Sequence, residues 1–70
     1  MIARINGRDV EIAAETSLLD YLAIVGLDPR TVAVEHNGEI LQRDVYERAI
    51  LRDGDVLEIV RMVGGGASTA

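Results

Sequence analysis

Polar and apolar residues alternate along two stretches at the start of the chain, which Asn6 and Gly7 separate. Alternation with a period of two is typical of a strand that buries one face. Asn-Gly favours the positive φ angles of a two-residue hairpin turn. The pattern therefore predicts strands over residues 2–6 and 8–12, joined as a hairpin.

Apolar residues then recur at the spacing of a helix, and two hydroxyl residues precede them. Thr16 or Ser17 can cap the first turn, and Asp20 follows Ser17 at the spacing of a capping box. Gly26 supplies a stop signal at the carboxyl end. The residues predicted to form this helix's apolar side are Leu18, Leu19, Leu22 and Val25.

The second half of the chain contains three further runs that are typical of strands, each bounded by turn residues. Residues 42–51 differ and predict a brief helical turn that covers the sheet edge. We therefore predict an α+β fold, with a mixed sheet of four or five strands wrapped over one helix. The further strands are expected over residues 31–36, 39–41 and 56–62, with turns at residues 37–38 and 52–55.

The composition narrows the class of protein. The chain has 70 residues and neither Phe nor Trp, which predicts one domain with an aliphatic core. It has no Cys, which fits a reducing compartment, and no apolar stretch of the ~20 residues that cross a membrane. Its net charge of −5 disfavours nucleic acid and anionic lipid. We expect a cytoplasmic protein, without a signal peptide, that docks on a basic partner surface.

The last predicted strand carries apolar residues on both faces. Leu57 and Ile59 share one face, which we expect to pack against the helix. The other face is then an apolar strip, typical of a docking surface. Alternatively, the segment that contains Tyr46 or Ile50 covers part of this strip. The predicted partner-binding residues are Val56, Glu58, Val60, Met62 and Val63.

Three glycines follow this strand and lead into a tail of small residues, 67–70. Glycine adopts backbone conformations closed to other residues and allows another protein to approach closely. Chain ends without packed side chains fray, so a frayed terminus without a function is the alternative. We predict a folded domain over residues 1–63 and a flexible arm and tail over residues 64–70.

The remaining polar residues give no sign of a catalytic or metal site. His36, the sole histidine, is predicted to be a solvated residue at a strand end, since no orienting partner or nucleophile is evident. Asp53 and Asp55 flank Gly54, but the further oxygen ligands of a calcium loop are absent. Turn formation explains these aspartates better.

The order of elements and two motifs together resemble the ThiS family, the sulfur carrier proteins of thiamine biosynthesis with a ubiquitin-like β-grasp fold. The motifs are Arg-Asp-Gly-Asp at residues 52–55 and Val-Gly-Gly-Gly at residues 63–66, one strand apart. The resemblance covers residues 1–66. It is the pairing of the two motifs that is specific, because either alone is weak.

The resemblance implies a function for the carboxyl end. In this family an E1-like adenylyltransferase (ThiF-like) uses ATP to adenylate the last glycine, which then becomes a thiocarboxylate and donates sulfur to thiazole synthase (ThiG-like). By position, Gly66 would carry the reactive carboxylate, preceded by Gly65 and Gly64. The chain itself would be a monomer that binds no cofactor and is not an enzyme.

The tail departs from the family pattern, because residues 67–70 hold the Gly66 carboxyl group in a peptide bond. A trimming protease, a tail foreign to the natural protein, or loss of the chemistry would each explain it, and we favour trimming. Cleavage after Gly65 would still leave the diglycine Gly64-Gly65. The alternative functions are a carrier like the small subunit of molybdopterin synthase, a non-catalytic β-grasp binding module, and a ubiquitin-like protein modifier.

Overall fold

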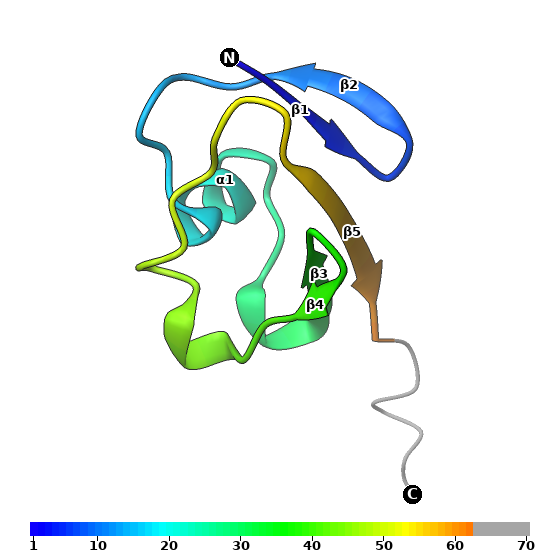
Figure 1. Ribbon diagram of the computed structural model, residues 1–70. Coiled ribbons are helices and arrows are strands. Elements are labelled where there is room, and N and C mark those ends of the chain that lie inside the picture. The colour runs from blue at the N-terminus through cyan, green and yellow to red at the C-terminus, as the bar shows by residue number, and fades with distance from the viewer. Residues whose placement is uncertain (63–70) are drawn as a thin grey trace, which may run out of the picture.

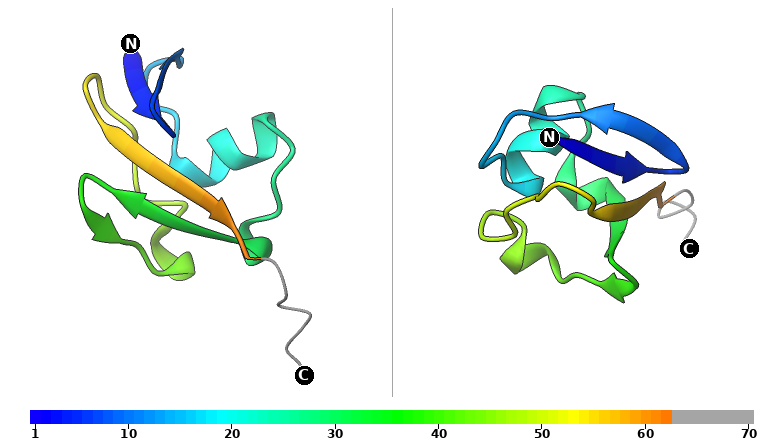
Figure 2. Two further views of the ribbon diagram at one scale, coloured as in Figure 1. Left: turned by 90° about the vertical axis from the view of Figure 1, so that its right-hand side faces the viewer. Right: turned by 45° about the horizontal axis from the view of Figure 1, so that its top comes forward.

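Within residues 1–62, five strands form one mixed sheet in the order β2-β1-β5-β3-β4 (Figure 1). The computed structural model describes residues 1–62. β5 runs parallel to β1 and antiparallel to β3, so the last strand of the described residues lies at the centre of the sheet (Figure 2). The strands are β1 (Ile2–Ile5), β2 (Arg8–Glu11), β3 (Val32–His36), β4 (Glu39–Ile40) and β5 (Val56–Arg61), and the helices are α1 (Leu18–Ile24) and the 3₁₀ turns η1 (Pro29–Thr31) and η2 (Arg43–Val45).

Both predicted Asn-Gly turns are confirmed. Asn6 and Gly7 have φ angles of 53° and 81°, and Asn37 and Gly38 have 50° and 89°. Two successive positive φ angles give the turn a twist that matches the strands on either side. The first turn joins β1 to β2, and the second joins β3 to the short strand β4.

The predicted helix is confirmed, with Ser17 as its N-cap. The Ser17 Oγ accepts a hydrogen bond of 3.0 Å from the backbone N–H of Asp20, which satisfies one of the free donors of the first turn. Leu18 and Leu22 are buried. The expectation for Val25 was wrong: the helix ends at Ile24, and Val25 is the C-cap and is 45% exposed.

The brief helical turn predicted within residues 42–51 is confirmed as η2, Arg43–Val45, and hydrogen bonds tie the segment that follows it to the start of α1. The Leu18 N–H donates to the carbonyl of Ala49 at 2.8 Å, and the Leu19 N–H donates to that of Tyr46 at 3.1 Å. Tyr46 is buried in the core. The alternative in which this segment covers the outer strip of the last strand is therefore wrong.

The core lies between α1 and one face of the sheet (Figure 2). It is aliphatic apart from Tyr46, as the composition predicts. No helix within residues 1–62 has the length and apolar character needed to span a membrane. The buried apolar residues are Ala3, Ile5, Ile12, Leu18, Leu22, Val32, Val34, Tyr46, Leu51 and Leu57.

Candidate functional site

The two faces of β5 differ as the alternation predicts. Leu57 is fully buried and Ile59 is partly buried against the core, whereas Glu58 is exposed on the other face. The predicted apolar residues of that outer face are all accessible: Val56 is 44% exposed, Val60 58% and Met62 49%. The other predicted site residues, Val63, Gly64, Gly65 and Gly66, lie outside the described residues.

The pairing of β3, β4 and β5 extends this exposed surface sideways. Ala33 lies opposite Val60, and Glu35 lies opposite both Glu58 on β5 and Ile40 on β4. Ile40 is 71% exposed, although it is a large apolar residue. We call this surface the outer patch; it consists of Ala33, Glu35, Ile40, Val56, Glu58 and Val60.

The outer patch contains a shallow hollow of about 150 Å³. It is bordered by Ile40 and Val60 and by the two glutamates Glu35 and Glu58. The sequence did not point to Ile40 as a site residue. β4 has only two residues, which is too few to show which face each side chain occupies. The nearest signal was the Asn-Gly turn, which predicts that residues just after it pair with β3.

The carboxyl end of β5 is held in place up to its last residue. β1 ends at Ile5, but the Asn6 side chain continues the pairing: its Oδ1 accepts from the Ile59 N–H at 2.7 Å, and its Nδ2 donates to the Ile59 carbonyl at 3.1 Å. Three residues later, just past the end of β5, the Met62 N–H donates to the carbonyl of Thr31 at 2.8 Å. The described part of the chain therefore ends at a fixed point, at the end of the outer face, and the predicted arm lies outside the described residues.

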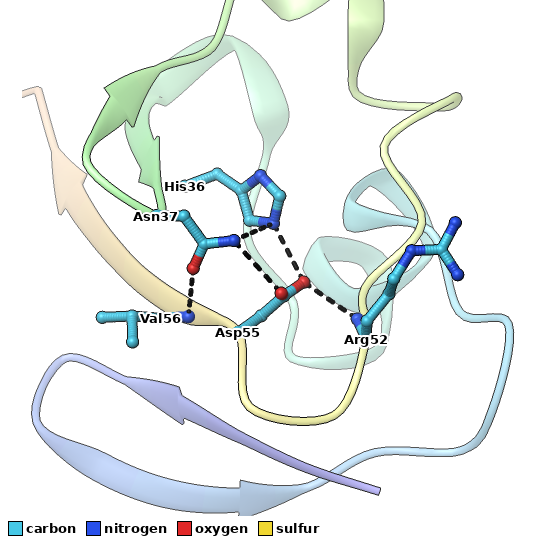
Figure 3. A network of polar contacts seen from close by, with 5 residues as sticks. All are labelled: His36, Asn37, Arg52, Asp55 and Val56. Carbon is cyan, nitrogen blue, oxygen red and sulfur yellow. Dashed lines mark hydrogen bonds and ion pairs between the residues drawn. The ribbon is translucent and has the colours of Figure 1, made fainter.

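A network of polar contacts fixes the opposite end of β5 (Figure 3). Asp55 Oδ2 lies 2.9 Å from His36 Nε2 and accepts the Arg52 backbone N–H at 2.9 Å, while its Oδ1 accepts from Asn37 Nδ2 at 3.1 Å. The Asn37 Oδ1 in turn accepts the Val56 backbone N–H at 2.8 Å. The turn between β3 and β4 is thereby joined to the turn that starts β5.

The surroundings of His36 differ from those predicted from the sequence. Its side chain is only 24% exposed and pairs with the buried Asp55, so the expectation of a solvated histidine was wrong. Burial by itself would raise the pKa of Asp55, but hydrogen bonds from His36, the Arg52 N–H and Asn37 outweigh it and lower the pKa below its ordinary value. The carboxylate therefore stays ionised and serves as the acceptor that holds the network together.

The aspartates of the turn before β5 have the structural role that the sequence predicts. Asp53 Oδ1 accepts the Ile2 backbone N–H at 2.7 Å, which ties the turn to β1. This contact helps to set where β5 begins. Across residues 1–62 there is no group of three or more carboxylate or imidazole side chains placed to hold a metal ion.

The sequence model of the ThiS family matches residues 3–66, which is nearly the whole chain. The chain belongs to the ThiS family. It is 42% identical over 64 residues to the sulfur carrier protein ThiS of Bacillus subtilis, covering 90% of this chain and 97% of that one. The crystal structure of the thiamine biosynthesis protein ThiS from Geobacter metallireducens superposes with a TM-score of 0.82 at 29% identity, covering 94% of this chain and all of that one.

Longer proteins contain a segment of the same kind. The thiazole synthase of Paramagnetospirillum magneticum is 41% identical to this chain over 66 residues, and that of Magnetococcus marinus is 35% identical. The match covers 94% of this chain but only 20% of either synthase. Membership of the ThiS family confirms the resemblance and the ubiquitin-like fold, and it makes this chain a sulfur carrier protein of thiamine biosynthesis.

Proposed function

We propose that Gly66 carries the transferable sulfur as a terminal thiocarboxylate. The observation that carries this proposal is the family match, which includes all three glycines and ends at residue 66. The anchored end of β5 supports it, because the described chain ends at a fixed point next to the exposed outer patch. Glycines at the end of such an arm suit entry into a narrow active site, since they have no side chain to clash.

The chemistry requires activation, because a carboxylate is a poor electrophile. In the first step, a carboxylate oxygen of Gly66 attacks the α-phosphate of ATP and pyrophosphate leaves, which gives an acyl-adenylate. A sulfur nucleophile then attacks the acyl carbon and AMP leaves. We propose that an E1-like adenylyltransferase (ThiF-like) binds the ATP and supplies the catalytic groups, while this chain is the acyl substrate and not an enzyme.

The Gly66 carboxylate must be free before this reaction can start. In the printed sequence it is bonded to Ala67, so residues 67–70 have to be removed by hydrolysis of the Gly66–Ala67 peptide bond. We propose a protease for this step. Cleavage one residue earlier would leave Gly65 as the reactive terminus, and the mass of the processed chain distinguishes the two sites.

We further propose that the thiocarboxylate is delivered in the cytoplasm to thiazole synthase (ThiG-like). The support is the pair of synthases that contain a segment similar to this chain. A carrier and an acceptor that work together gain from being joined, since linkage raises their effective concentration. The outer patch is the surface on which this partner would dock.

Intact-protein mass spectrometry tests the proposal. The chain purified from its native host should have a mass that ends at Gly66, and incubation with ATP, sulfide and the E1-like enzyme should add the mass difference between sulfur and oxygen. The matched control is Gly66→Ala, which should fold normally but show a much smaller mass conversion. A chain that retains residues 67–70 and gains no mass, with an E1-like enzyme active on another carrier, would favour the binding module instead.

A further inference from the structure

Two glutamates face each other across the outer patch. Glu35 on β3 and Glu58 on β5 are direct partners in the antiparallel register, and both are exposed. Like charges placed directly opposite destabilise a sheet. Among the described residues neither glutamate forms an ion pair, and Arg4, opposite Val56 on the same face, pairs with Asp9 at 2.9 Å instead. The isolated domain therefore bears a repulsion that a cation from outside would relieve.

The surroundings of the two carboxylates define what kind of cation fits. The hollow between them has apolar walls, formed by Ala33 with its cross-strand neighbour Val60 and by Ile40. A hydrated ion gains nothing from apolar walls. A long basic side chain does, because its methylene stem packs on apolar groups while its charged head reaches the carboxylates. Arginine suits two acceptors better than lysine, since its planar guanidinium offers five N–H donors in a fixed fork.

We propose that the outer patch binds one arginine side chain of thiazole synthase. Its methylene groups would lie over Ala33, Ile40 and Val60, and its guanidinium would lie between the carboxylates of Glu35 and Glu58. This inference rests on the proposed function, because it names the partner that receives the sulfur. The net charge of −5 favours the same kind of partner, one that docks with a basic surface.

Binding of the chain ending at Gly66 to the thiazole synthase of the same genome, measured by calorimetry, tests the inference. Glu35→Gln and Glu58→Gln each remove one charged acceptor without changing side-chain size, and each should weaken binding about tenfold or more, as expected for a hydrogen bond to a charged group. The matched control is Glu11→Gln, an exposed glutamate on β2 at the far edge of the sheet. This variant should bind like the unchanged chain.

The stability of the free chain provides a second readout with the opposite sign. Because Glu35→Gln and Glu58→Gln each end the repulsion across the strands, each should raise the midpoint of thermal unfolding while weakening binding. A merely structural role for these residues would lower both. A double-mutant cycle that combines Glu58→Gln with alanine at each exposed arginine of the synthase should then identify one strongly coupled arginine.

Three results would overturn the inference. They are unchanged affinity of both glutamine variants, an equal loss in the Glu11→Gln control, and the absence of any coupled arginine. Failure of the proposed function itself looks different: the mass assay would then show no thiocarboxylate, or the unchanged chain would not bind the synthase. Loss of binding to the E1-like enzyme alone would assign the two glutamates to that partner and would refute the choice of thiazole synthase.

Discussion

Replacing Asp55 by alanine should destabilise the fold more than any other change in a polar side chain. The Asp55 carboxylate accepts hydrogen bonds from His36, Asn37 and the Arg52 backbone N–H. It is nearly buried, with 11% of the side chain exposed, so water can replace these bonds only in part. The alanine variant would leave three donors without their acceptor, two of them on the adjacent residues His36 and Asn37 and one in the turn before β5.

The size of the effect follows from these contacts. A hydrogen bond to a charged group contributes about 1.5–3 kcal/mol, and bonds that share one carboxylate are not additive. We therefore expect Asp55→Ala to lower the free energy of unfolding by about 3 kcal/mol. A domain of this size has roughly 3–5 kcal/mol available, so the variant should be partly unfolded at 25 °C. Asp55→Asn keeps one acceptor oxygen and should lose clearly less.

Urea unfolding at pH 7 measures this loss. The tyrosine fluorescence reports on the core, since the chain has no Trp, Tyr46 is buried, and Tyr21 is partly buried against the same core. The midpoint should fall in the order unchanged chain, Asp55→Asn, Asp55→Ala, while the slope with urea stays the same. Asp44→Ala, at an exposed aspartate in η2, is the control and should have little effect. A loss below about 1 kcal/mol for Asp55→Ala would refute the reasoning, because a loss that small is typical of a solvent-exposed ion pair and not of a buried network.

Three further predictions concern acid, the core and the outer patch. Folding lowers the pKa of Asp55, so the ionised carboxylate stabilises the fold fully above its unfolded pKa of about 3.9, and this stabilisation is lost as the pH falls through the lower folded pKa. The free energy of unfolding of Asp55→Asn should therefore depend less on pH below about 4 than that of the unchanged chain. Leu57→Ala should lower the free energy of unfolding in urea by about 2–5 kcal/mol, since the Leu57 side chain is fully buried in the core. A smaller loss would mean that the core collapses around the gap. Val60→Ser should change the free energy of unfolding by less than about 0.5 kcal/mol yet weaken binding to thiazole synthase, and a large loss of stability would contradict the exposure of Val60.

Local signals in the sequence predicted most of the fold. The Asn6-Gly7 and Asn37-Gly38 turns need only the φ preferences of their own residues, and the Ser17 cap needs only a donor three residues away. The alternation along β5 predicted which of its side chains are exposed, because burial on one face has a fixed period in a strand. These features depend on neighbours in the sequence, which a pattern can show.

Contacts between distant parts of the chain were not predictable in the same way. His36 and Asp55 are 19 positions apart, and only the pairing of β3 with β5 brings them together. Similarly, Glu35 and Glu58 become partners through the sheet register and not through any local motif. The roles of Gly66 and of the partner-binding residues remain predictions, and the experiments above test them.

The hydrogen bond from the Met62 N–H to the Thr31 carbonyl has a consequence for the partners' shape. It is the last backbone anchor of the described chain, and Gly66, where the family match ends, is the fourth residue after Met62. Fully extended, four residues span at most about 14 Å. If Gly66 is the reactive terminus, as we propose, a partner that holds the end of β5 at its surface must keep its reactive atoms within that depth. The reach from Met62 to Gly66 would then limit which enzymes can use this carrier.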